Sequence, residues 1–147
     1  YQHRYRLKEA DLTSYHAIEV PVDLKDEQTT TAIIEAISQL SQPRIIVIDT
    51  VNRALGGGDE NSSKDVGALL GNAERIKAAF PDSSVILVHH FGKDSTKGSR
   101  GHSSLSGNVG AEFHIKSDAG GTRTVICKKQ REGATDVELY FEFIYEV

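Results

Sequence analysis

The chain has 147 residues, of which 17 are basic and 21 acidic, with 38% hydrophobic residues and a formal net charge of −4. This length suits one globular domain, and the composition excludes a disordered or fibrous protein. The apolar runs are far shorter than the roughly 20 residues that a membrane-spanning helix needs, so no membrane partner is expected, and the net charge argues against a general polyanion binder.

Two compositional details concern the origin of the chain. It begins with Tyr1 and contains no Met, so we expect a trimmed or excised polypeptide. It opens without a basic segment followed by an apolar one, so no secretory signal is expected. The lone Cys127 rules out an internal disulfide and a cysteine zinc cluster, which fits a cytoplasmic protein.

The first third of the chain predicts a lead-in to a larger fold. Residues 1–15 have the spacing of a weak helix, and residues 17–20 have the alternation of a short strand that ends before a proline. Residues 27–40 carry apolar side chains at one-turn spacing, which predicts a helix capped by Asp26 or Thr29.

The middle of the chain predicts a strand, a helix and a second strand. Residues 44–49 form an apolar, β-branched run, and residues 84–90 form another, which is typical of parallel strands buried on both faces. Residues 62–80 between them have helical periodicity, and Ser62 with Asp65 has capping-box spacing. A glycine triplet before this helix indicates a flexible connector. The unit is a crossover, so a parallel sheet is expected.

The last third predicts antiparallel strands. Residues 91–107 are rich in Gly, Ser, Lys and His without periodicity, which indicates a long basic loop. Residues 109–115, 122–128 and 137–145 alternate as strands do, and the turns between them contain glycine. We expect two hairpins, and a single partial α/β domain over residues 1–147.

Polar residues follow both parallel strands. Asp49 and Thr50 end the first and His89 and His90 end the second, so they share the sheet edge where α/β proteins bind ligands. An acid after an apolar strand is the pattern that holds a Mg²⁺-bound nucleotide; a turn cap is an equally weighted alternative for Asp49. The histidines are either polar strand ends or sensors of a terminal phosphate, and a shared metal is disfavoured because strand neighbours point to opposite faces.

Basic residues lie at two other places. Lys93, Lys97 and Arg100 form either a solvated loop face or contacts to phosphates. Residues 128–131 contain three cations before a glycine turn and are either an ordinary charged turn or a finger that acts on a neighbouring subunit. The sequence contains neither a G-x-x-x-x-G-K-[ST] phosphate loop nor a nucleophile elbow.

Four segments together resemble the later part of a RecA-type ATPase core, within the P-loop NTPases. The resemblance is to the AAA_25 family of phage and plasmid proteins, which includes hexameric plasmid helicases of the RepA type. The matching segments are IIVIDT at 45–50, RALGG and DEN within 53–61, VHHFGK at 88–93, and RGHSSL at 100–105. Residues 123–143 also resemble the end of DnaB-like helicase domains.

The resemblance implies a role for each matching residue. Asp49 is the Walker B acid that holds Mg²⁺ through water, with Thr50 beside it, and His90 is the polar sensor. Lys129 and Arg131 are cations that act in trans on a neighbour's nucleotide. Lys93 and Arg100 contact nucleotide or DNA.

The resemblance also implies what is missing. Family members place the phosphate loop and a catalytic Glu before the region that corresponds to Tyr1, and Gly110 stands where relatives commonly carry an acid. We therefore expect part of an ATP-dependent, DNA-acting motor that uses ATP and Mg²⁺ in the complete protein. By itself this chain should neither bind ATP tightly nor hydrolyse it.

The expected partners are DNA, preferentially single-stranded, and further copies in a ring, filament or swapped dimer. An alternative is a non-catalytic DNA-binding or oligomerisation module derived from such an ATPase. An unrelated α/β ligand-binding domain ranks lower.

Overall fold

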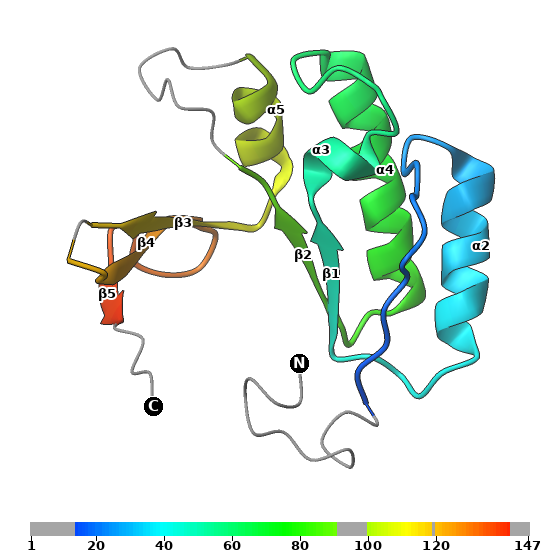
Figure 1. The fold of residues 1–147 in the computed structure, drawn as a ribbon, viewed down its shortest axis with the longest axis horizontal. Coiled ribbons are helices and arrows are strands. Elements are labelled where there is room, and N and C mark those ends of the chain that lie inside the picture. Colours follow the sequence, from blue (N-terminus) through cyan, green and yellow to red (C-terminus); the bar gives the residue numbers. More distant parts are fainter. Residues whose placement is uncertain (1–13, 91–99, 119, 142–147) are drawn as a thin grey trace. The chain divides into compact units, whose positions relative to one another are not determined.

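The computed structural model describes residues 14–90, 100–118 and 120–141, which form two compact units (Figure 1). The first unit spans Tyr1–Lys97 and the second spans Gly98–Val147. The predicted weak helix at residues 1–15 falls almost wholly outside the described residues. In the described part of the chain, no helix has the length and apolar character needed to cross a bilayer.

The first helix, α2 (Glu27–Ser38), confirms the prediction of a helix after Asp26. The Asp26 carboxylate accepts a 2.7 Å hydrogen bond from the Thr29 amide, so Asp26 is the cap. The predicted strand at residues 17–20 is wrong, because that segment has no regular structure. A strand needs a ladder partner, and the nearby pairing found among the described residues is a single bridge between Asp23 and Leu55.

The parallel sheet of the first unit contains β1 (Ile45–Asp49) and β2 (Ser84–Val88). The strands are paired in parallel register from Ile45 opposite Ser84 to Asp49 opposite Val88, which confirms the predicted crossover. Between them lie α3 (Val51–Ala54) and α4 (Ser63–Ala79).

Helix α4 supplies the largest share of the core of the first unit. It begins as predicted at Ser62, whose hydroxyl accepts from the Asp65 amide at 3.3 Å. Its apolar face is buried, and α4 packs against α2 and β2. The most deeply buried apolar side chains of the unit come from α4, from α3 and its C-cap, and from the segment before α2: Leu24, Val51, Leu55, Val66, Leu69 and Ile76.

The prediction that both strands are buried on both faces is wrong. Ile45, Val47 and Ile86 are 60%, 54% and 44% exposed. Within the described residues of the first unit, helices cover one face of this sheet and nothing covers the other. A hydrophobic run indicates that a strand can be buried on both faces. Actual burial also requires another element that covers each face.

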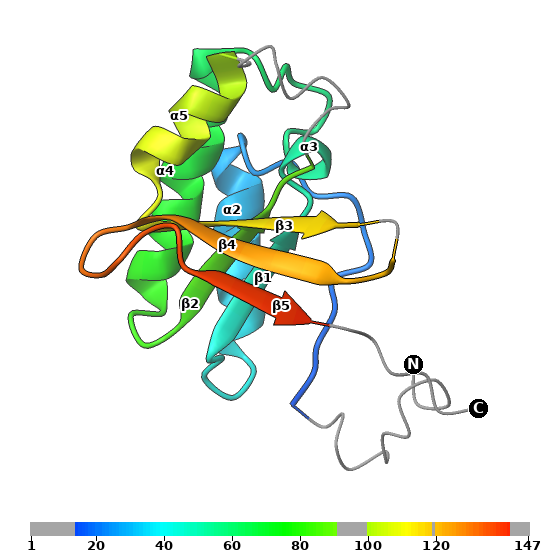
Figure 2. The same cartoon turned by 90° about the vertical axis from the view of Figure 1, so that its left-hand side faces the viewer.

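The second unit is an antiparallel sheet entered through a helix (Figure 2). Helix α5 (Arg100–Asn108) leads to β3 (Ala111–Ser117), β4 (Arg123–Gln130) and β5 (Glu138–Phe141), which pair in that order. The two predicted hairpins are confirmed, with strand ends shifted by one to two residues; residues 142–145 of the last predicted strand lie outside the described residues.

The predicted loop at residues 91–107 is wrong over residues 100–107, which are helical, and residues 91–99 are not described. The helix was missed because its contacts are largely polar. Leu105 is buried, but Asn108 donates to the Ser104 carbonyl at 2.8 Å, and Lys129 reaches the last turn of the helix.

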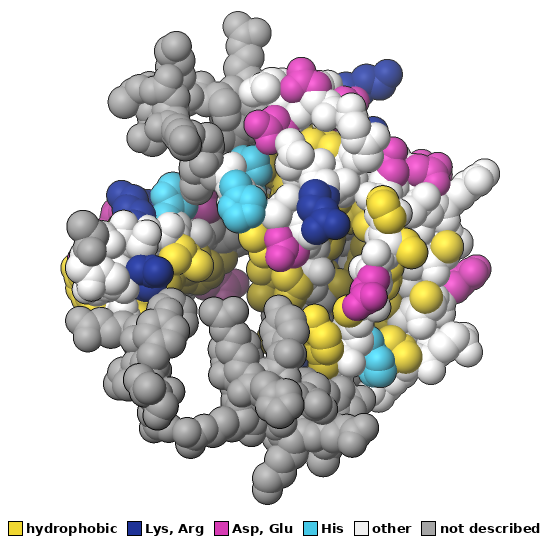
Figure 3. All heavy atoms as spheres, in the orientation of Figure 1, with side chains coloured by type: hydrophobic (Ala, Val, Ile, Leu, Met, Phe, Trp, Pro, Cys, Tyr) yellow, Lys and Arg dark blue, Asp and Glu magenta, His cyan; other side chains and the backbone are white. Residues whose placement is uncertain are grey.

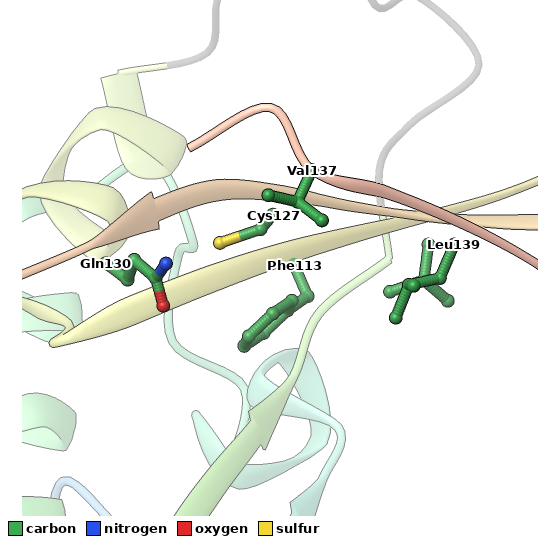
Figure 4. Close-up of a pocket in the computed structure, with 6 residues that line it drawn as sticks. Phe113, Cys127, Gln130, Val137 and Leu139 are labelled. Atoms are coloured by element: carbon green, nitrogen blue, oxygen red, sulfur yellow. The ribbon is translucent and has the colours of Figure 1, made fainter. Parts of the chain in front are cut away.

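The sheet of the second unit turns its apolar side outward. Phe113 and Ile115 are 58% and 72% exposed, whereas the side chains of Glu112 and His114, on the other side of β3, are 16% and 22% exposed. A pocket of about 180 Å³ lies on the apolar side, where Phe113, Cys127 and Leu139 surround it with Val125, Gln130 and Val137 (Figure 4).

Candidate functional site

The carboxyl ends of β1 and β2 bring the candidate acid and the histidines to one edge. Asp49 is the last residue of β1 and lies opposite Val88, the last residue of β2, so His89 and His90 follow at the same edge. Figure 3 shows histidine, acidic and basic side chains on the face of the first unit where these strands end. This edge is where parallel α/β proteins bind ligands.

Asp49 and Thr50 differ in burial and in hydrogen bonding at the end of β1. Thr50 is almost fully buried and caps α3, since its hydroxyl accepts from the Arg53 amide at 3.5 Å. The residue that caps the turn after β1 is thus Thr50 rather than Asp49. The peptide bond between the two residues is cis. The Asp49 carboxylate is exposed and makes no hydrogen bond or ion pair with the described residues, so it is available to a ligand.

The two histidines differ in burial. His90 is exposed, whereas His89 is half-buried and its Nδ1 atom is buried. Because β2 ends at Val88, both follow the strand rather than lie within it, and the predicted strand at 84–90 is two residues too long. The described residues contain no group of three or more His, Cys, Asp and Glu side chains that could by itself hold a metal.

The loop between α3 and α4, expected as a flexible connector, contains several hydrogen bonds of its own. The Gly58 amide donates to the Leu55 carbonyl at 2.8 Å, and the Asp59 amide donates to the Asp65 carboxylate at 3.0 Å. The Asn52 amide group also donates to Glu60 at 3.2 Å. The Asn52 bond therefore links the loop to α3, which follows β1 directly.

The remaining predicted site residues lie outside the described residues or belong to the second unit. Lys93 lies outside the described residues, and Arg100 begins α5. Lys129 and Arg131 belong to the second unit, as predicted near the β4–β5 turn, but they differ in surroundings. Lys129 Nζ donates to the carbonyls of the last turn of α5, and Arg131 is exposed.

Sequence reasoning missed a polar cluster in the second unit. The Ser106 hydroxyl donates to Glu112 Oε2 at 2.5 Å, and His114 Nε2 lies 2.5 Å from Glu112 Oε1. The sequence did contain a signal for this cluster. Glu112 and His114 are two ionisable residues that alternate with apolar residues along one strand, so they must lie on the same side of the sheet.

Comparison with known proteins supports the expected family. The sequence model of the AAA_25 family, described as an AAA domain, matches residues 2–96. No curated protein matches the chain. The matched region contains β1, α4, β2 and the edge that carries Asp49 and the histidines. The chain therefore belongs to the AAA_25 family of AAA domains, a P-loop NTPase family.

Proposed function

We propose that the chain is the later part of a RecA-like, ATP-dependent motor that acts on DNA, of the kind found in phages, plasmids and mobile elements. The observation that carries this proposal is the exposed Asp49 carboxylate at the carboxyl end of β1, beside the end of β2, within a region of P-loop NTPase sequence. A carboxylate at that place holds hydrated Mg²⁺ on the β and γ phosphates in such enzymes.

The described residues fit the metal but not the whole nucleotide. Asp49 supplies an oxygen ligand with no competing partner among them, which suits indirect coordination through water. His90 is exposed at the neighbouring strand end, where its imidazole can donate to a phosphate oxygen. The 147 residues include no phosphate loop, so the main cradle of the phosphates has to come from elsewhere.

The coding sequence upstream of Tyr1 is the first test. The proposal expects it to encode G-x-x-x-x-G-K-[ST] followed by a catalytic Glu. An upstream start codon without this motif would instead favour the non-catalytic module, as would salt-dependent DNA binding by a chain without ATPase activity.

The second test is Asp49→Asn in the full-length gene product. Loss of the Mg²⁺-holding charge should lower kcat for ATP hydrolysis by about 100-fold or more. The matched control is Asp82→Asn, because Asp82 is exposed, precedes β2 at the opposite end of the sheet and bonds only to Gln42 among the described side chains. Equal activity of the two variants would contradict the role of Asp49.

Self-association is also proposed, and two surfaces support it. Ile45, Val47 and Ile86 leave one face of the parallel sheet exposed, and Phe113 and Ile115 do the same in the second unit. Exposed apolar patches and open strand edges are characteristic of protein interfaces. A ring or filament would cover such surfaces and bring Arg131 of one copy to the nucleotide of the next.

A further inference from the structure

The two cations of the K-x-R segment have different surroundings. The Lys129 ammonium donates to the Ser106 carbonyl at 2.6 Å and to the Gly107 carbonyl at 3.2 Å. Both carbonyls belong to the last turn of α5, which ends at Asn108. Carbonyls in the last turn of a helix lack partners within the helix and carry partial negative charge, so an ammonium stabilises them.

A second strand holds the same residue of α5. Glu112 lies opposite Lys129 in the β3–β4 pair and accepts a hydrogen bond from the Ser106 hydroxyl at 2.5 Å. His114 Nε2 contacts the other carboxylate oxygen of Glu112. Ser106 is therefore held through its carbonyl by β4 and through its hydroxyl by β3, and both of these contacts are partly buried.

The neighbouring cations show that this arrangement is specific to Lys129. Lys128 is exposed and pairs with Asp136 at 2.7 Å, and the pKa of Lys128 is raised by that hydrogen bond. Arg131 is exposed, and its guanidinium has no hydrogen bond or ion pair with the described part of the chain. The segment thus contains one cation used within the fold and one directed to solvent.

We propose that Lys129 and Glu112 are positioning residues that fix the C-terminal end of α5 on the β3–β4 pair, and that Arg131 alone acts on the neighbouring subunit. The part concerning Arg131 rests on the proposed motor function; the part concerning Lys129 and Glu112 does not. By holding α5 to the β3–β4 pair, the two residues fix the end of β4, after which the turn that carries Arg131 begins.

Amide hydrogen exchange of the 147-residue chain tests the positioning role. Lys129→Met keeps the aliphatic stem but removes the ammonium, so amides of residues 104–109 should exchange about tenfold faster relative to those of α4. Lys128→Met is the matched control and should change them by less than about twofold. Lys129→Arg retains donors for both carbonyls and should restore protection.

Glu112→Ala provides an independent measurement, useful if Lys129→Met unfolds the second unit. It should also accelerate exchange at residues 104–109, whereas Glu112→Gln, which still accepts from Ser106, should do so less. Equal protection of α5 in the Lys129→Met and Lys128→Met variants, or normal protection in Glu112→Ala, would overturn the positioning role.

ATP hydrolysis by the full-length gene product separates this role from the motor function. Arg131→Ala should lower kcat by about 1000-fold while leaving exchange of α5 unchanged. If Lys129→Met lowers kcat equally and leaves α5 protected, Lys129 acts in trans and the inference is wrong. If Arg131→Ala retains full activity while Lys129→Met loosens α5, the positioning role stands and the proposed action of Arg131 fails.

Discussion

The side-chain amide of Asn72 donates a 2.8 Å hydrogen bond to the backbone carbonyl of Leu24, 48 residues earlier in the chain. Asn72 is buried within α4, and Leu24 is among the most deeply buried residues of the first unit. The Asn72 carbonyl in turn accepts from Arg75 at 3.0 Å. This contact ties the irregular segment before α2 to the core, because a buried carbonyl without a partner is costly.

Replacing Asn72 by Ala should lower the free energy of unfolding by about 1–3 kcal/mol, since it leaves the Leu24 carbonyl buried without this donor. Urea unfolding followed by circular dichroism measures the change. Asn52→Ala is the matched control, because the Asn52 bond to Glu60 is exposed and should contribute less than about 0.5 kcal/mol. Similar losses for both variants would show that burial of the Asn72 contact is unimportant.

Two adjacent glycines should respond differently to alanine. Gly56 has a φ of 52°, and a Cβ there would overlap the Asp23 side chain, which is itself held by the Lys25 amide. Gly57 has a φ of 82° but open space around the Cβ position. Gly57→Ala should therefore show only left-handed strain of roughly 1–2 kcal/mol, and Gly56→Ala should lose about 1–3 kcal/mol more. Thermal unfolding that ranks the variants equally would contradict this contact.

The Asp26 cap of α2 should make the free energy of unfolding depend on pH in the acidic range. Hydrogen bonds from the Thr29 side chain and amide lower the pKa of Asp26 below 3.8. A carboxyl with a lowered pKa in the folded state stabilises the protein above its unfolded pKa, and that contribution is lost as pH falls through the lowered value. Asp26→Asn keeps a capping oxygen without titration, so the difference between wild type and Asp26→Asn should shrink below pH 3.8. A pH-independent difference in urea midpoints would argue against it.

The outward apolar side of the second sheet should promote self-association. Ile115→Thr keeps a β-branched side chain and removes apolar surface, so the concentration-dependent rise in sedimentation coefficient should weaken. Lys116→Thr alters the next residue, on the other side of β3, and should leave association unchanged. Wild-type protein that stays monomeric at high concentration would count against both sheets as interfaces.

The sequence predicted the elements whose apolar residues follow a regular helical or strand pattern. The helix α4 has a regular apolar stripe, and β1 and β2 are uniform β-branched runs, so their type and parallel order followed from periodicity and handedness. The shared edge of Asp49, His89 and His90 followed from the same topology. The missed helix α5 has little apolar signal, and its last turn bonds to Lys129, which lies more than 20 residues away in the sequence.

Two features could not be predicted from the sequence: the exposure of one face of each sheet, and the different surroundings of Lys129 and Arg131. Periodicity reports which side of an element is apolar, but it does not report whether another element covers that side. Likewise, two cations separated by one residue look equivalent in a sequence, and only the position of the α5 carbonyls distinguishes them.

The uncovered strand faces have a thermodynamic consequence. Unfolding of this chain exposes less new apolar surface than unfolding of a protein that buries both faces of its sheets, because Ile45, Val47, Phe113 and Ile115 are already in contact with water. Its urea m-value and its heat-capacity increment on unfolding should both be low for 147 residues, since the two quantities scale with newly exposed area. Assembly that covers these faces should raise both the m-value and the heat-capacity increment, so calorimetry alone would detect a partner bound to these sheets.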